Sequence, residues 1–131
     1  MINRDYMSLE WWKGYLLKLG FNIQLEYHEG VHYTKNDWVI STQTERHLVF
    51  DTLIITIFQQ DNMEVFKEGS YIEERIYFED SEVNYPEVIR LRESVLLVLS
   101  AIVDPSKAPL LAGISWADEI MAFLLGAESD D

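Results

Sequence analysis

The chain has 131 residues, no cysteine, 48% hydrophobic residues and a formal net charge of −13. This length and apolar content suit one folded domain over residues 1–131. The absence of cysteine excludes disulfides, thiolate metal sites and a cysteine nucleophile, and it fits a reducing, cytoplasmic location. The excess of acid disfavours nucleic acid and membrane surfaces as partners, because both attract clusters of Lys and Arg.

The first predicted element is an amphipathic helix between Ser8 and Gly20. Ser8 is a favourable N-cap residue, and Gly20 ends the helical pattern. Trp12, Leu16 and Leu19 return at intervals of three or four residues, which forms one apolar helix face. We therefore expect this helix to pack on the core through that face.

An antiparallel meander of about four to five strands is predicted next. Apolar and polar residues alternate from Phe21 to His28, which is the pattern of a half-buried strand. The pair Glu29-Gly30 predicts a turn, after which the chain returns as a hairpin partner. The remaining strands are expected in the ranges Val31–Thr34, Trp38–Ser41, Leu48–Phe58 as a central strand, and Ile72–Phe78 at an edge. Residues Asp61–Ser70 fit a short helix or a strand equally well.

A second helix is predicted from about Asn84 to Val103. Pro86 suits its first turn, and its second half is apolar on all sides, so we expect it to be central and buried. Residues 104–113 contain two prolines and one glycine, which predicts a linker.

The last predicted helix starts at Ser115, whose spacing to Asp118 is that of a capping box, and ends at Gly126. Residues 127–131 are expected to form a frayed acidic tail. Together the elements predict an α+β fold, with an N-terminal helix, the meander, and two C-terminal helices packed on one face of the sheet.

One string matches a catalytic pattern. His28-Glu29-Gly30-Val31-His32 reads H-E-x-x-H, which in zinc metalloproteases places two histidines on the metal. That chemistry needs a helix, since only one helical turn brings both imidazoles to a single ion. The alternation around the string predicts a hairpin instead, and Glu26 and Thr34 depart from the residues that the longer motif expects. We interpret His28 and His32 as hairpin residues and keep a zinc metallohydrolase as an alternative.

The negative charge is concentrated. Residues 61–87 carry nine acidic and two basic residues, and residues 108–131 carry five acidic and no basic residues. Such a surface suits a basic protein partner. The predicted partner-binding residues combine carboxylates with tyrosine anchors: Glu64, Glu68, Tyr71, Glu73, Glu74, Tyr77, Glu79, Asp80 and Glu82. No Gly-rich phosphate loop and no catalytic constellation is present, so no cofactor is expected.

These features predict a small acidic binding protein without catalytic activity. In size, acidity, lack of cysteine and lack of a catalytic motif, it resembles bacterial immunity proteins and phage-encoded inhibitors as a class. That resemblance implies that it neutralises a toxin, a nuclease or another nucleic-acid-binding enzyme. The alternative from another class is an assembly subunit that pairs with a second copy through the apolar helices around Val95–Val103 and Ile120–Leu125.

Overall fold

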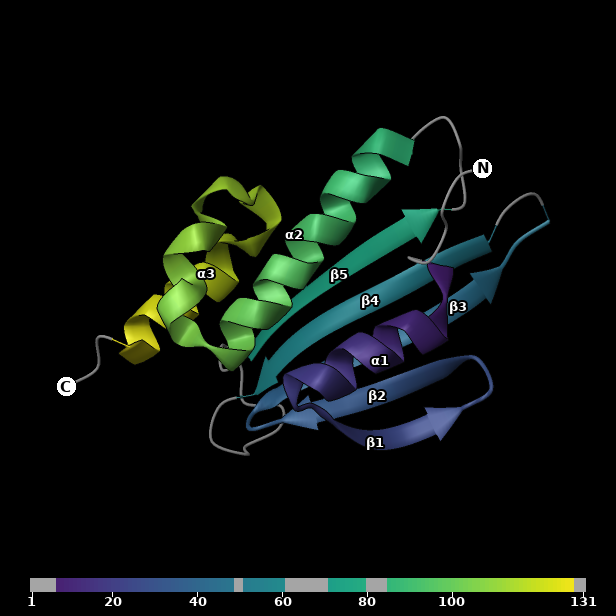
Figure 1. Ribbon diagram of the computed structural model, residues 1–131, viewed down its shortest axis with the longest axis horizontal. Helices are drawn as coiled ribbons and strands as arrows, with labels where there is room; N and C mark the ends of the chain where they lie inside the picture. The colour runs from purple at the N-terminus through teal and green to yellow at the C-terminus, as the bar shows by residue number, and fades with distance from the viewer. Residues whose placement is uncertain (1–6, 49–50, 61–70, 80–84, 129–131) are drawn as a thin grey trace. The chain divides into compact units, whose positions relative to one another are not determined.

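The computed structural model describes residues 7–48, 51–60, 71–79 and 85–128 (Figure 1). It contains an N-terminal helix, a five-stranded antiparallel sheet and C-terminal helices, so the predicted α+β class is confirmed. The chain forms two compact units, Met1–Val88 and Ile89–Asp131. In chain order the elements are α1 (Leu9–Leu19), β1 (Asn22–Tyr27), β2 (Gly30–Lys35), β3 (Trp38–Arg46), β4 (Asp51–Gln60), β5 (Tyr71–Glu79), α2 (Tyr85–Val103), η2 (Pro105–Gly113), η3 (Ser115–Ala117) and α3 (Asp118–Glu128).

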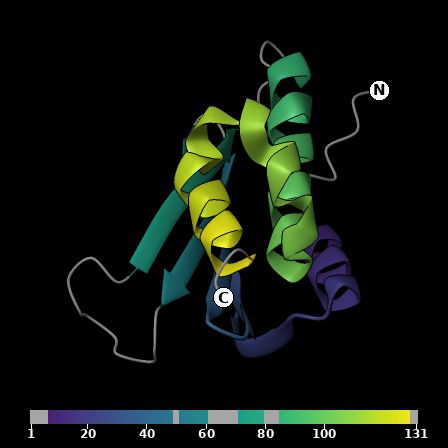
Figure 2. The same cartoon turned by 90° about the vertical axis from the view of Figure 1, so that its left-hand side faces the viewer.

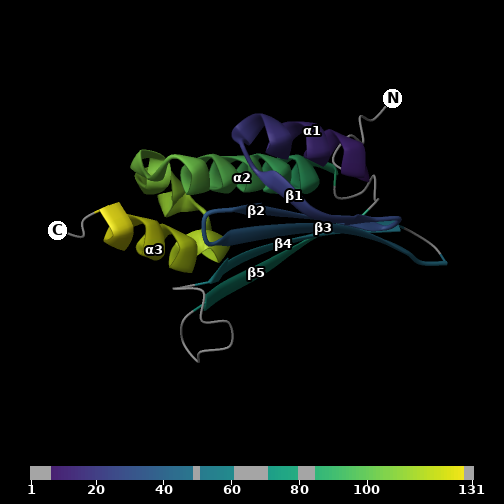
Figure 3. The same cartoon turned by 90° about the horizontal axis from the view of Figure 1, so that it is seen from below.

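Helix α1 begins and ends where the sequence predicts. The Ser8 hydroxyl oxygen accepts a hydrogen bond from the backbone N–H of Trp11 at 3.2 Å. Gly20 closes the helix in the left-handed conformation, at a φ of 101°. Trp12 and Leu16 are fully buried, and the Trp12 ring lies 5.8 Å from that of Phe78 on β5. The apolar face of α1 therefore packs on one face of the sheet, as Figure 3 shows.

The strands lie side by side in chain order, each antiparallel to the next. The face toward α1 holds most of the buried apolar side chains of the sheet: Val31, Tyr33, Trp38, Ile40, Leu53, Ile55, Ile57, Ile76 and Phe78. One polar group on this face is satisfied within the sheet, because the Thr42 hydroxyl donates a hydrogen bond to the Val31 carbonyl at 3.2 Å. The predictions that β4 is internal and that β5 is an edge strand are confirmed.

Strand β1 differs from its prediction. Its alternation predicts a half-buried strand, but all six residues are exposed. The helix packs mainly on β2 and β3 and reaches β1 through an ion pair between Lys13 and the exposed Glu26 carboxylate. A bulge between Ile23 and Leu25 interrupts the pairing of β1 with β2. The turn also lies one residue earlier than expected, at His28-Glu29, and Gly30 begins β2.

The C-terminal unit contains most of α2, followed by η2, η3 and α3. The segment predicted as a linker is a 3-10 helix, η2, because Asp104 caps it and a proline occupies its first turn. The predicted capping box at Ser115 is wrong. Ser115 is the first residue of the short 3-10 turn η3, whose N-cap residue is Ile114 and which has no side-chain cap, and α3 begins only at Asp118. Helix α3 ends at Glu128, two residues beyond Gly126.

Within this unit η2 and α3 lie side by side (Figure 2). Val95, Val98 and Leu99 of α2 are fully buried, as its apolar second half predicts. None of the helices in the described ranges is both long and apolar enough to cross a membrane. Residues 61–70 and the last three residues of the predicted tail lie outside the described residues. Packing of the C-terminal helices on the sheet stays a prediction.

Replacement of Gly30 tests the packing at the start of β2. A Cβ atom at this position would lie 2.7 Å from the Thr42 carbonyl oxygen and 2.7 Å from the Tyr27 hydroxyl oxygen. Because the carbonyl belongs to the neighbouring strand, we expect Gly30→Ala to lower the free energy of unfolding by about 1–3 kcal/mol. Gly14 is the matched control, since a Cβ there meets nothing within 4 Å. Gly14→Ala should raise stability by about 0.5–1 kcal/mol. Urea titrations measure both, and equal effects would contradict this packing.

A second prediction concerns Asp104, the N-cap residue of η2. Asp104 Oδ1 accepts hydrogen bonds from the Ser106 hydroxyl at 2.7 Å and from the Ser106 backbone N–H at 3.2 Å. The hydroxyl is the main cause that holds the pKa of Asp104 below its ordinary value. Because the folded-state pKa is lowered, the cap stabilises fully above the ordinary pKa, and this contribution is lost as the pH falls through the lowered value.

We therefore expect Ser106→Ala to move the pKa of Asp104 back up toward its ordinary value. A carbon-detected NMR titration of the Asp104 carboxyl group, in the original protein and in the variant, measures this pKa. An unchanged pKa in the variant would show that the hydroxyl is not the cause.

Candidate binding face of the sheet

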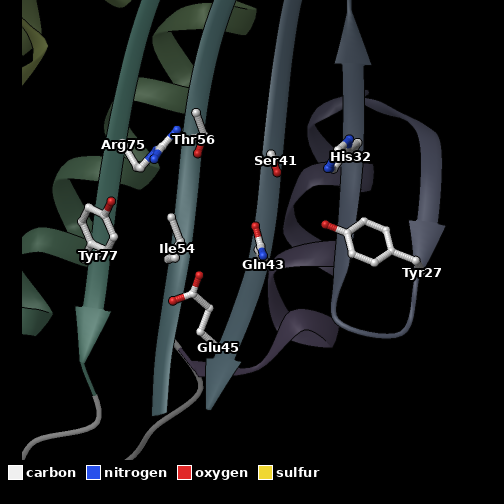
Figure 4. Close-up of a pocket in the computed structure, with 9 residues that line it drawn as sticks. All are labelled: Tyr27, His32, Ser41, Gln43, Glu45, Ile54, Thr56, Arg75 and Tyr77. Carbon is white, nitrogen blue, oxygen red and sulfur yellow. The ribbon is translucent and has the colours of Figure 1, made fainter. Parts of the chain in front are cut away.

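The face of the sheet opposite α1, here called the open face, is the one that carries His32, Ser41, Thr56 and Arg75. This face contains a shallow pocket, here called the hollow, with a volume of about 490 Å³. All five strands contribute to the lining: Tyr27, His32, Ser41, Gln43, Glu45, Ile54, Thr56, Arg75 and Tyr77. Figure 4 shows these side chains projecting from the same side of the sheet. Pockets that combine aromatic side chains with a few convergent polar groups are typical of binding sites.

The strand register explains why residues so far apart in sequence meet here. One transverse row runs across β2, β3, β4 and β5 as His32, Ser41, Thr56 and Arg75. The next row, two residues along each strand, contains Gln43, Ile54 and Tyr77. Since side chains two residues apart share a face, both rows project into the hollow.

Tyr27 forms one wall of the hollow. Its ring makes an edge-on contact with the His32 ring, at 5.6 Å and 83°. Its hydroxyl lies over Gly30, where a Cβ atom would collide with it. Glycine at this position therefore lets the tyrosine lie across β2. Tyr27 is 42% exposed and Tyr77, on the opposite wall, is 51% exposed, so both rings are accessible to a partner.

Arg75, the arginine that lines the hollow, is bound by residues of its own strand, β5. Arg75 Nη2 donates a hydrogen bond to Glu73 Oε1 at 3.0 Å. The pKa of Arg75 is raised, first by hydrogen bonding to Tyr77 and then by Glu73. Its positive charge is therefore offset by a carboxylate two residues away on the same face.

Two further carboxylates lie at one end of the open face. Glu45 on β3, Thr52 on β4 and Glu79 on β5 are successive partners across the sheet. With neighbouring strands about 4.8 Å apart, the backbones of the two glutamates are roughly 10 Å apart. Glu45 also lies 3.7 Å from His47 Nε2, an ion pair that forms only when the imidazole is protonated. With Arg75 offset by Glu73, this end of the open face is acidic.

The predicted partner-binding residues are distributed between two faces. Glu73, Tyr77 and Glu79 lie on the open face, whereas Glu74 pairs with Ile57 and points to the α1 face. The alternation of a strand separates Glu74 from the other three. Tyr71 is the first residue of β5. The remaining predicted positions lie outside the described residues: Glu64, Glu68, Asp80 and Glu82.

Sequence reasoning missed the contribution of β1 and β3 to this face. Every residue from Ser41 to Arg46 is polar, so the sequence of β3 has no alternation that would assign Gln43 and Glu45 to one face. The predicted partner-binding residues came from the acidic range 61–87 instead, and therefore included none from β1 or β3. Tyr27 gave no separate signal, because its role depends on the space above Gly30.

The H-E-x-x-H string lies on a hairpin, as predicted. His28 is in the turn after β1, and His32 is in β2 with its side chain at the hollow. The string therefore lacks the helical turn that places both imidazoles on one zinc ion. Among the described residues, no group of three His, Asp or Glu side chains is arranged to hold a metal ion.

Comparison with family models, with curated proteins and with solved structures gave no match. Function is therefore inferred from the geometry and charge of the open face.

Proposed function

We propose that this protein is a binding protein without catalytic activity, which neutralises a basic protein partner by holding it on the open face. One observation carries the proposal. Glu45 from β3 and Glu73 and Glu79 from β5 lie on the same face of the sheet as the exposed rings of Tyr27 and Tyr77.

The carboxylates and the tyrosine rings affect different steps in the formation of such a complex. Carboxylates attract a basic partner over several ångströms and raise the rate of encounter. Tyrosine rings act at contact, since they bury large apolar area and lose few rotamers on binding. A neutralising protein needs only these two properties, because it acts by covering the partner's basic surface. No observation favours the alternative of a homo-oligomer formed through the apolar helices, because Val95, Leu99 and Ile120 are already buried within the single chain.

Charge reversal tests the electrostatic part. The partner is first enriched from an extract of the native cells at low salt and eluted by a salt step. We expect Glu45→Lys combined with Glu79→Lys to slow association with that partner by about 10- to 100-fold at low ionic strength, measured by surface plasmon resonance. The difference should shrink as salt rises and the Debye length falls to about 8 Å.

The matched control reverses two exposed carboxylates of the C-terminal unit, Glu93 and Glu119. It changes the net charge equally, so association should slow by less than about threefold. If both double variants slow association alike, the overall charge and not the open face governs binding.

Truncation of Tyr77 tests the contact part. The ring is half exposed, so its loss costs the fold little. We expect Tyr77→Ala to raise the dissociation rate about 30-fold with little change in association, as at a binding hot spot. Leu110→Ala is the control, because Leu110 is 60% exposed on η2. An unchanged dissociation rate for Tyr77→Ala would place the contact elsewhere.

A further inference from the structure

The acidic end of the hollow has the composition of a receptor for a single cationic side chain. Its floor is Ile54, which is 8% exposed. Gln43 lies on one side of Ile54 and Tyr77 on the other, in the same transverse row. In Figure 4 the Glu45 carboxylate points toward Ile54, which lies between Gln43 and Tyr77.

The charges inside the hollow favour a cation over an anion. Arg75 is the basic residue that lines it, and Glu73 and Tyr77 already engage that guanidinium. His32 is in edge-on contact with the Tyr27 ring. By contrast, Glu45 lines one end of the hollow, and Glu79 lies beyond Thr52 in the same transverse row, so a cation bound there would be attracted by one carboxylate of the lining and a second one beside it.

We propose that this end of the hollow binds an arginine side chain of the partner. The aliphatic stem packs on Ile54, because the methylenes of arginine cover apolar surface while the head stays polar. The guanidinium reaches the Glu45 carboxylate and the Gln43 amide oxygen, and it lies against the Tyr77 ring. Arginine fits better than lysine, since a planar guanidinium both stacks on an aromatic ring and forms paired hydrogen bonds to a carboxylate. This inference rests on the proposed function and names the chemistry of the partner's anchor.

A peptide titration followed by NMR tests it without the natural partner. The probes are the blocked tripeptide acetyl-Gly-Arg-Gly-amide and the same peptide with citrulline, which keeps the shape of arginine but lacks the charge. We expect the arginine peptide to bind at least about fivefold more tightly than the citrulline peptide. The shifted backbone amides should be those around Gln43, Glu45, Ile54 and Tyr77. The lysine peptide should bind more weakly than the arginine peptide.

Conservative variants locate the site. Glu45→Gln preserves the shape of the side chain, and we expect it to reduce the advantage of arginine over citrulline to about twofold or less. Glu93→Gln, on the exposed surface of α2, is the matched control and should leave that advantage unchanged.

Several outcomes would overturn the inference. These are equal binding of the arginine and citrulline peptides, shifted amides outside the hollow, and an equal loss in the Glu93→Gln variant. The charge-reversal experiment with the whole partner judges the proposed function separately. If charge reversal slows association while the arginine peptide does not bind, the open face receives a basic partner but without an arginine anchor. If the peptide binds and charge reversal has no effect on the partner, the arginine site exists and the proposed function is wrong.

Discussion

The packing of α1 on one face of the sheet is the constraint on which the rest of this unit depends. Trp12 and Leu16 are fully buried, and Trp12 reaches Phe78 at the far edge strand. A fully buried large apolar side chain contributes about 1.5–3 kcal/mol, so these contacts strongly favour one face as the core. Because the side chains of a strand alternate, this choice sends every second residue of all five strands to the opposite face. A register slip of one residue would exchange the two faces and expose the core.

The open face is a consequence of that choice, and its polar residues are organised across the strands. The row from His32 to Arg75 is polar throughout, and the neighbouring row contains one apolar residue, Ile54, between Gln43 and Tyr77. Arg75 would oppose a basic partner if its charge stood alone. Its hydrogen bond to Glu73 makes it part of a surface that is acidic as a whole.

Several local predictions succeeded because short-range physical chemistry decides them. The N-cap at Ser8 and the stop at Gly20 depend on hydrogen bonds and backbone freedom within one turn. The hairpin between β1 and β2 follows from apolar and polar alternation beside a turn, although the predicted turn at Glu29-Gly30 lies one residue later than the observed one. The capping box at Ser115 failed because the chain enters α3 through a 3-10 turn, so Ser115 never occupies the N-cap position. The Ser-x-x-Asp spacing alone does not distinguish a capped α-helix from one that is preceded by a 3-10 turn.

The sequence by itself determined the α+β class, the element order and the acidity of the region that contains β5. These properties are local or are sums over composition. Only the tertiary structure decided that β1 is exposed on both faces, that Glu73 and not Glu74 lies on the open face, and that Glu45 shares a row with Glu79. The physical reason is that strand register and the placement of α1 depend on contacts between residues distant in the chain, and a single sequence carries no direct signal of those pairings.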